Sequence, residues 1–286
     1  MLKVTDITSL KQVYDYQLRL SAPYFFPVNF ESWKESFEKD IDGAGRLLFK
    51  ELHGKAAYDG DTLVGFIQYG NTAFGFDECG EISTDVSYPI IRSLYLDEGR
   101  EDAGKLLLEE ALYEFKAAKN VYAFFHYFGM SCFARHGKLF EQYTWIKELL
   151  HQYGFVIEHE NVYYSADVQS NHLSEIEIIA HDLTSGNQQT FDFCLNQKHI
   201  GGCEVHYPET QGTAFLRWIY VIDEVQNQGV GSKCMTALKK WLYDQGMNRL
   251  DTDTALDNYR AQHYYEKNDF TRKGITRSYF IECQIA

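Results

Sequence analysis

A pair of glycines at the start of an expected helix is the feature of this sequence that most directly suggests chemistry. Trp218–Ser232 reads W-I-Y-V-I-D-E-V-Q-N-Q-G-V-G-S, a β-branched strand followed by a polar turn and then by the helix. Backbone N–H groups at a helix N-terminus are unpaired and carry partial positive charge, which suits a phosphate. Gly229 and Gly231 have no Cβ to hinder an anion, and Ser232 adds a hydroxyl donor. Taken alone, the segment fits a tight strand-to-helix turn equally well.

Two motifs in this half of the chain together resemble a known family. Residues 226–231, Q-N-Q-G-V-G, resemble the pyrophosphate signature Q/R-x-x-G-x-G/A of the GCN5-related N-acetyltransferases, the GNAT family. A second family motif, N-x-x-A-x-x-x-Y-x-x-x-G-F, begins 27 residues after Gly231 and is matched by Asn258, Ala261, Tyr265 and Phe270. Asp269 stands where the family usually has glycine. The resemblance covers about Gln189–Phe280.

The resemblance implies that acetyl-coenzyme A is the cosubstrate and that its acetyl group passes directly to a primary amine of a small molecule or peptide. In the family fold two neighbouring parallel strands splay apart, and here these would be Thr213–Ile222 and Arg249–Thr254. The pantetheine arm would pair with the open edge of the first strand, and the helix amides would hold the pyrophosphate. The cofactor-binding residues implied in this way are Ile219, Tyr220, Val221, Gln226, Asn227, Gln228, Gly229, Val230, Gly231, Ser232, Asn258 and Tyr265.

The resemblance also implies catalytic roles at this site. Tyr265 would protonate the leaving thiolate as general acid, and the backbone N–H of Val221 would polarise the thioester carbonyl. Tyr264 is adjacent, and neighbouring helical side chains point about 100° apart, so only one of the two tyrosines can face the strand gap. The register of the motif favours Tyr265.

Candidates for the general base that deprotonates the amine come in two strand pairs. Glu204 and His206 share one face of their strand, and Asp251 and Asp253 do the same on another strand. A polar face turned to solvent is the simpler explanation of each pair, and Glu204 is kept as the candidate. Direct transfer forms no covalent enzyme intermediate, so it requires no nucleophilic cysteine.

The elements expected around these residues occur in the same order in both halves of the chain. Each half has a hairpin, a strand, a helix, a strand, a helix and two closing strands, which indicates an internal repeat. The turn pair Asp59-Gly60 predicts the first hairpin, and the closing strands are expected within Phe155–Val168 and after Phe270. Asn29 is a plausible cap for a helix that follows it, and Ala73–Tyr88 is expected to be an inserted loop.

The fold class predicted from this order is α/β (α+β), with two GNAT-like domains. Each would have a mixed, largely antiparallel sheet with a splayed parallel strand pair, flanked by helices. The polar stretch Gln169–Leu173 marks the seam, which gives a degenerate domain at residues 1–168 and a catalytic, acetyl-CoA-binding domain at residues 169–286.

The first half departs from the family pattern where the phosphate loop should be. Glu98, Glu101 and Asp102 would crowd a pyrophosphate with like charge, so this half is expected to have kept the fold and lost the cofactor. The second half has too little chain before Phe191 for the two helices that often wall the acceptor pocket in the family. Loops of the first half, such as Phe128–Gln142, are a hypothetical substitute for that wall.

Composition excludes several classes of function. The formal net charge is −14 and no basic stripe is present, which argues against a nucleic-acid partner. The six cysteines form no C-x-x-C pair and match no zinc spacing, so we expect free buried thiols in a reducing cytoplasm and no metal. No apolar run approaches the roughly 20 residues that span a bilayer, so no membrane association is expected.

Two alternatives to an N-acetyltransferase remain open at this level. The protein could be a non-catalytic binding protein with acetyl-CoA as regulatory ligand, although such a protein needs the phosphate loop and not Tyr265. The acyl group could also be succinyl or a longer chain. The sequence identifies neither the acceptor nor the oligomeric state.

Overall fold

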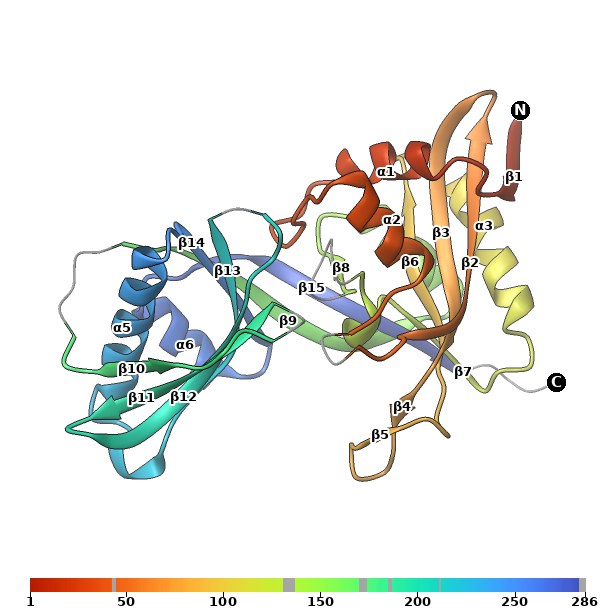
Figure 1. The fold of residues 1–286 in the computed structure, drawn as a ribbon. Helices are drawn as coiled ribbons and strands as arrows, with labels where there is room; N and C mark the ends of the chain where they lie inside the picture. Colours follow the sequence, from red (N-terminus) through yellow and green to blue (C-terminus); the bar gives the residue numbers. More distant parts are fainter. Residues whose placement is uncertain (43–44, 131–136, 170–173, 185–186, 211, 283–286) are drawn as a thin grey trace. The chain divides into compact units, whose positions relative to one another are not determined.

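The structure is a computed structural model that describes residues 1–42, 45–130, 137–169, 174–184, 187–210 and 212–282. Residue contacts divide the chain into two compact units (Figure 1). Unit 1 comprises Met1–Asp42, Arg46–Glu160 and Thr276–Ala286, and unit 2 consists mainly of Asn161–Ile275. The seam expected at Gln169–Leu173 lies outside the described residues except for Gln169.

Unit 1 is built on one sheet in the strand order β1-β2-β3-β6-β7-β15, in which β6 and β7 are parallel. The expected hairpin is present, because Asp59 pairs with Thr62 and Gly60 between them has φ +59°. The strands are β1 Leu2–Asp6, β2 Phe49–Asp59, β3 Thr62–Thr72, β6 Pro89–Leu96, β7 Asn120–Ala123 and the C-terminal part of β15 Thr271–Glu282; β8 Leu139–Phe140 pairs with β15.

The helices of unit 1 cover both faces of this sheet: α1 Leu10–Leu18 and α2 Phe30–Glu38 lie on one side, and α3 Glu101–Glu114 lies on the other (Figure 1). α4 Thr144–Gln152 and the short 3₁₀ helix η1 His126–Phe128 complete the unit. Asn29 caps α2 as predicted, since its Oδ1 accepts from the amide of Ser32 at 3.0 Å. The segment expected as a loop, Ala73–Tyr88, contains a small hairpin of β4 Gly75–Phe76 and β5 Ile82–Ser83.

The strands of unit 2 pair in the order β9-β14-β13-β12-β11-β10, with β13 and β14 parallel. The strands are β9 Val156–Asp167, β10 Glu177–Ala180, β11 Gln188–Leu195, β12 Lys198–His206, β13 Thr213–Val221 and β14 Arg249–Ala255. The helices are η2 Asp223–Val225, α5 Val230–Asp244 and α6 Tyr259–Lys267. β10 was not expected from the sequence, because four residues are too few to show an alternating pattern.

In the described part of unit 2, helices cover one face of the sheet only (Figure 1). The hydrophobic core forms between that face and α5, where Cys234, Leu238 and Leu242 are buried. Unit 1 has α1 and α2 between its first two strands, whereas the described residues between β10 and β11 form no helix. The opposite face of this sheet therefore lacks the two helices, as the short chain before Phe191 predicts.

The closing strands differ from the prediction in a way that links the two units along the chain. Two strands were expected within Phe155–Val168 and two more after Phe270, but each segment forms one long strand, β9 and β15. Residues 156–160 of β9 belong to unit 1 and residues 161–167 to unit 2, and β15 passes in the opposite direction from unit 2 to unit 1 at Thr276. Each unit therefore takes part of its sheet from a strand that begins or ends in the other.

Candidate active site

β13 loses its parallel partner half-way along its length. It pairs with β14 only from Thr213 to Leu216. Residues 217–221 continue beside β12, and no described strand pairs with their other edge. A β-bulge at Arg217 increases the twist where the two strands separate. The backbone groups on this free edge can pair with an extended ligand, so the structure contains the splayed strands that the resemblance implies.

Helix α5, which follows this strand, begins with an open first turn. Its N-cap, Gly229, has φ +78°, and no side chain caps the turn. The first amide of the helix with a described backbone partner is that of Lys233, which donates to the Gly229 carbonyl at 3.3 Å. A Cβ on Gly229 would meet no atom within 4 Å. The amides of Val230, Gly231 and Ser232 are therefore placed to donate to an anion.

Two glutamines shape the turn that precedes α5. Gln226 Nε2 donates to the Val221 carbonyl at 2.9 Å, and Gln228 Nε2 donates to the Glu224 carbonyl at 2.8 Å. Their side chains therefore hold the turn together and leave the helix amides to a ligand. Arg260 on α6 donates to Gln226 Oε1 at 2.6 Å and brings a positive charge to this turn. The sequence reasoning missed Arg260, although its place two residues after Asn258 in the second motif was a usable signal.

Tyr265 lies where the two splayed strands part. It is buried and hydrogen-bonded to Thr252, the last residue of β14 that pairs with β13. Its ring packs against Tyr164 and Phe270, with centroids 5.8 and 5.4 Å away. Burial raises the pKa of Tyr265, and the hydrogen bond between Tyr265 and Thr252 opposes this shift. The phenol is therefore protonated at neutral pH and can act only as an acid.

Tyr264 and Asn258 also occupy defined places near α5. The Tyr264 hydroxyl donates to the Gly231 carbonyl at 2.8 Å. Tyr264 therefore contacts α5, whereas Tyr265 contacts β14. A Cβ on Gly231 would approach the Tyr264 ring to 3.2 Å, which explains why glycine fits there. Asn258 caps α6 by accepting from the Ala261 amide at 3.1 Å, and its Nδ2 group is the part that can donate to a ligand.

The candidate base Glu204 is held by an arginine. Arg217, the bulge residue of β13, donates to Glu204 Oε1 at 2.5 Å. The Glu204 side chain keeps 15% of its surface exposed, so water reaches it. His206 lies on the same face of β12 and is also partly exposed.

The second acidic pair, Asp251 and Asp253, does not form the expected solvent-facing polar surface. Asp251 has no exposed surface, because β14 is an inner strand of the sheet. Its carboxylate accepts from Arg249 at 2.6 Å and from the Tyr163 hydroxyl at 2.8 Å, which together balance the buried charge. Asp253 is half-buried and accepts from Asn161. It also lies close enough to Tyr265 to raise the pKa of that phenol.

Neither the cysteines nor the ionisable groups of the described residues gather into a metal-binding cluster. No group of three or more His, Cys, Asp or Glu residues in the described ranges could hold a metal ion. Cys194, Cys203 and Cys234 are free and buried as expected, whereas Cys79 is exposed. Burial raises the pKa of the Cys234 thiol to about 12, which makes it a poor nucleophile. Cys132 and Cys283 lie outside the described residues.

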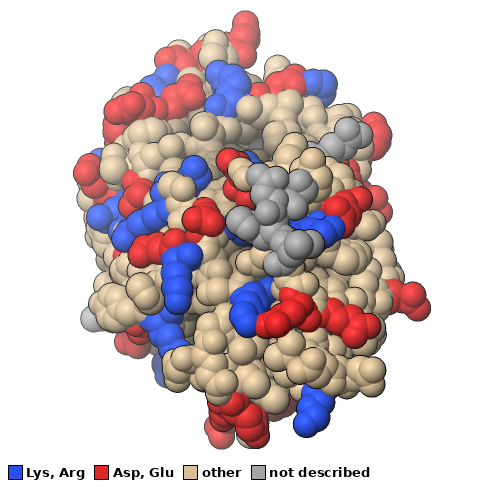
Figure 2. Space-filling view, turned by 90° about the vertical axis from the view of Figure 1, so that its left-hand side faces the viewer, with Lys and Arg blue, Asp and Glu red and all other residues tan. Residues whose placement is uncertain are grey.

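The surface and the helices give two further observations. None of the helices in the described part of the chain is both long and apolar enough to cross a membrane. On the face drawn in Figure 2, acidic and basic side chains are interspersed and do not gather into one basic patch.

Comparison with known proteins identifies the family of one part of the chain. A family model described as the Acetyltransferase (GNAT) family matches residues 148–270, a range that contains the splayed strands and the open helix start. Residues 148–270 therefore contain a GNAT-family domain. This domain makes the protein a GNAT-type acyltransferase. None of the curated proteins matches its sequence.

Several solved structures share the GNAT fold with this chain. A tandem GNAT protein from the clavulanic acid biosynthesis pathway, solved without acetyl-CoA, matches 100% of both chains with TM-score 0.66 and 10% identity. A fungal GNAT glucosamine N-acetyltransferase region within a multi-domain GH3 β-N-acetylglucosaminidase has TM-score 0.65 and 11% identity. That match covers 98% of this chain and 38% of the fungal one. A GNAT protein from Sphaerobacter thermophilus has TM-score 0.51 and 10% identity over 81% of each chain. These likenesses establish a tandem GNAT fold for the whole chain.

The GNAT fold of unit 1 has a corresponding helix, α3, whose first turn is filled by its own side chains. Asp102 accepts from the Ala103 amide and from Arg100 Nε at 3.1 Å. These interactions, Arg100 foremost, lower the pKa of Asp102 and keep a negative charge in the turn. A Cβ on Gly104 would lie 2.6 Å from a methyl of Leu149, so this glycine serves close packing.

The strand edge in unit 1 is also occupied. Gly65 pairs with Leu96 as Gly201 pairs with Val221, so Leu96 and Val221 hold equivalent positions in the two GNAT units. Trp145 Nε1 donates to the Leu96 carbonyl at 3.0 Å. One position earlier, Tyr95 is buried against other aromatic rings, with centroids 5.5 to 6.2 Å away: Phe25, Phe66, Phe124 and Tyr143.

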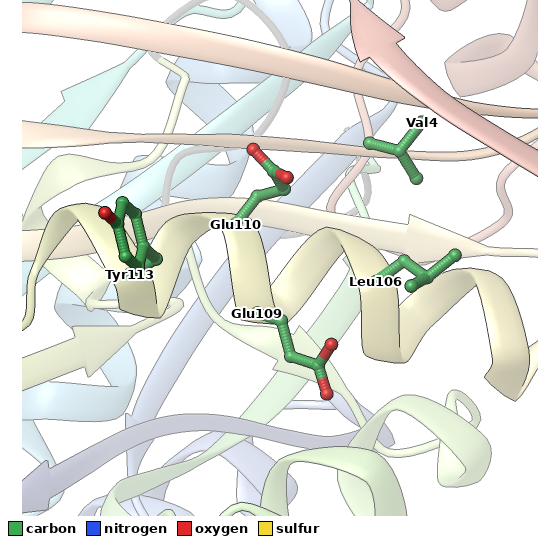
Figure 3. Close-up of a pocket in the computed structure, with 5 residues that line it drawn as sticks. All are labelled: Val4, Leu106, Glu109, Glu110 and Tyr113. Atoms are coloured by element: carbon green, nitrogen blue, oxygen red, sulfur yellow. The ribbon is translucent and has the colours of Figure 1, made fainter.

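A hollow in unit 1 lies away from all of these groups, between β1 and α3 (Figure 3). Its lining residues are Val4, Leu106, Glu109, Glu110 and Tyr113. None of them belongs to either GNAT motif, so the hollow is not part of the candidate active site.

Proposed function

We propose that unit 2 transfers an acetyl group from acetyl-CoA to a primary amine of a small molecule or peptide. The observation that supports this most directly is the combination of an uncapped helix start with a strand edge that has lost its partner. One binds a diphosphate and the other binds an extended amide chain. Acetyl-CoA contains both groups in one molecule.

In this proposal the donor lies along β13 and across the start of α5. The backbone of Ile219, Tyr220 and Val221 pairs with the pantetheine arm. The amides of residues 228–232 hold the pyrophosphate, and the charge of Arg260 adds to their attraction. Asn258 Nδ2 donates to a pantetheine carbonyl.

The chemical step is a direct acyl transfer. The amine nitrogen attacks the thioester carbon, whose oxygen is stabilised by the Val221 amide. The C–S bond then breaks, and Tyr265 protonates the departing thiolate. The raised pKa of Tyr265 suits this role, because the phenol stays protonated throughout the neutral range. The proton lost by the amine passes to a carboxylate.

Glu204 is the proposed base, acting through water that reaches its partly exposed carboxylate. Arg217 holds this carboxylate in place through its hydrogen bond to Glu204 Oε1. Asp253 is a second candidate because it lies near Tyr265. The pH dependence of kcat/KM in Glu204→Gln and Asp253→Asn variants separates them, since loss of the true base removes the acidic limb of the profile.

We further propose that unit 1 binds no acetyl-CoA, because Asp102 and Trp145 occupy the equivalent helix start and strand edge. The chain would then bind one acetyl-CoA, through unit 2. We also propose a cytoplasmic location, which the four free thiols among the described residues support.

Calorimetric titration of the whole protein with acetyl-CoA tests this function. We expect one site per chain, lost in Gly229→Glu, because the new carboxylate faces the phosphate. Gly99→Glu is the matched control: Gly99 has φ +80° against +78° for Gly229, and neither position has an atom within 4 Å of a built Cβ. The control should bind normally. Two sites would contradict the assignment of unit 1, and no binding at millimolar ligand would refute the proposed function.

A further inference from the structure

The uncovered face of the unit 2 sheet exposes residues whose counterparts in unit 1 are buried. The common register relates the two sheets position by position. In unit 1, α1 and α2 reach this face: the Tyr16 ring lies 5.8 Å from that of Phe66, and Gln68 donates to the Phe37 carbonyl. The counterparts in units 1 and 2 are Phe66 and Gly202, Gln68 and Glu204, Ser93 and Trp218, and Tyr95 and Tyr220.

Two aromatic side chains stand out on this face. Trp218 is 41% exposed and Tyr220 is 48% exposed, whereas their counterparts Ser93 and Tyr95 are 6% and 5% exposed. The two rings lie 6.0 Å apart with planes inclined at 38°. Both residues belong to the part of β13 that has separated from β14, so they are next to the proposed thioester site.

A carboxylate on β11, which is separated from β13 by β12, lies on the same face of the sheet. Asp192 and Tyr220 both flank Gly202, which pairs with each of them across the sheet. A Cβ on Gly202 would lie 2.7 Å from the Phe191 carbonyl oxygen, 3.4 Å from the Tyr220 ring and 3.8 Å from Asp192 Oδ1, so only glycine fits here. The Tyr220 ring and the Asp192 carboxylate therefore lie on two sides of one spot beside Gly202, which we call the Gly202 spot. An ammonium group is the ligand that both groups attract.

We infer that the Gly202 spot holds a second ammonium group of the acceptor, so that the acceptor is a diamine or polyamine. The inference rests on the proposed function, which supplies the amine that reacts. A strand rises about 3.3 Å per residue, so the rings of Trp218 and Tyr220 lie within roughly 10 Å of the Val221 amide. A chain of about four methylenes spans much of that distance between two nitrogens.

The charges on this face favour a cation over an acidic ligand or a second copy of the chain. The Asp192 carboxylate already lies beside two imidazole rings, with His181 Nε2 at 2.9 Å and His199 Nε2 at 3.5 Å from its two oxygens. The guanidinium of Arg217 is engaged by Glu204 and is therefore less available to an acid. An apolar interface between copies would place the Asp192 carboxylate against an apolar surface at high cost.

Titration of the full chain, saturated with CoA, with putrescine, butylamine and glutarate tests the inference. Heat and tryptophan fluorescence are measured, since Trp218 would lie at the ligand. We expect putrescine to bind at least about tenfold more tightly than butylamine, because only putrescine carries the second ammonium. Trp218→Leu and Asp192→Asn should each weaken putrescine binding about 5- to 30-fold. Tyr243→Leu is the control, because Tyr243 is 46% exposed on α5 and does not belong to the strands that form the Gly202 spot.

Four results would overturn the inference: equal binding of putrescine and butylamine, tighter binding of glutarate, an unchanged putrescine affinity in both variants, or a wild-type dimer that Trp218→Leu converts to a monomer. Titration of the same variants with acetyl-CoA separates this failure from that of the proposed function. Normal acetyl-CoA binding without a putrescine preference refutes only the polyamine acceptor. Loss of acetyl-CoA binding in the wild type refutes the proposed function itself.

Discussion

The two GNAT units carry the same strand-and-helix framework but opposite chemistry at the start of the central helix. In unit 2, α5 begins at Gly229 with no side-chain cap. In unit 1, α3 begins at Arg100 with Glu101 and Asp102 in its first turn. A helix start attracts negative charge in either case, and the difference is whether the protein or a ligand supplies it.

The strand edges beside these helices show the same contrast. Residues 93–96 of β6 are all buried, whereas residues 217–221 of β13 are at least partly exposed throughout. Both strands carry an arginine at the equivalent bulge, Arg92 and Arg217. Arg92 is enclosed and pairs with Asp40, and Arg217 stays near solvent and pairs with Glu204. A GNAT framework can thus be converted from an open site to a closed core with its bulge retained.

The largest effect, a loss of folding, is expected when the chain is cut at the domain boundary predicted from the sequence. A chain of residues 169–286 lacks the segment of β9 that belongs to unit 2. That segment contributes core side chains that are 0–4% exposed: Val162, Tyr164 and Ala166. Burial of each large side chain contributes about 1.5–3 kcal/mol to the free energy of unfolding, which is about 5–15 kcal/mol in total for a domain. We expect no cooperative thermal transition in circular dichroism.

A chain of residues 161–275 is the control for this truncation, because it keeps that segment and omits the part of β15 that belongs to unit 1. It should unfold cooperatively. Cooperative unfolding of the 169–286 chain would show that β9 is dispensable and that unit 2 is continuous in sequence.

The next effect concerns the charge at the start of α5. Ser232→Asp places a carboxylate in its first turn, as Asp102 does in α3. The helix should gain about 0.3–1 kcal/mol from this charge, while acetyl-CoA affinity should fall at least about 100-fold through repulsion of the pyrophosphate. Thermal unfolding and calorimetry measure the two quantities on the same sample.

Asp102→Ser is the mirror change in unit 1. It should destabilise α3 and create no acetyl-CoA site, because Trp145 still occupies the strand edge. If Ser232→Asp lost stability as well as acetyl-CoA affinity, the weaker binding would be explained by misfolding and not by repulsion from the new charge. A second acetyl-CoA site in Asp102→Ser would show that the negative charge of Asp102 is by itself enough to prevent unit 1 from binding acetyl-CoA.

The tyrosine pair of α6 provides a smaller and more local test. Tyr265→Phe removes the proposed acid, so kcat should fall about 100-fold or more with acetyl-CoA affinity unchanged. Tyr264→Phe removes the hydrogen bond to the Gly231 carbonyl, which should cost about 0.5–1.5 kcal/mol of stability and leave the chemical step intact. Release of CoA from acetyl-CoA with a reactive amine measures kcat. Equal kcat in both variants would assign no acid role to Tyr265.

Local signals in the sequence predicted much of this arrangement. The Asn29 cap, the Asp59-Gly60 hairpin and the glycine start of α5 each depend on residues close together in the chain. The exchange of β9 and β15 depends on pairing between distant segments, and nothing within either strand encodes its partner. Burial of Asp251 was missed for the same reason, because Tyr163 lies 88 residues away from it. β1 was missed because its five residues, L-K-V-T-D, are largely polar.

The smallest effect expected concerns a tyrosine–glutamate pair that both units contain. Tyr153 donates to Glu109 in unit 1 and Tyr164 donates to Glu266 in unit 2, at 2.7 and 3.0 Å. Burial, followed by the neighbouring carboxylate, raises the pKa of each phenol to about 12. Since the folded-state pKa is raised, the stabilisation is complete below the unfolded value near 10 and is lost as the pH rises towards 12. Tyr153→Phe and Tyr164→Phe should each flatten the decline of the unfolding free energy between pH 10 and 12 by a similar amount, measured by urea unfolding. A flatter pH dependence in only one of the two variants would show that the two tyrosine–glutamate pairs have different surroundings, although both contain the same hydrogen bond. The two units would then be alike in their helices and strands but not in the environment of these tyrosines.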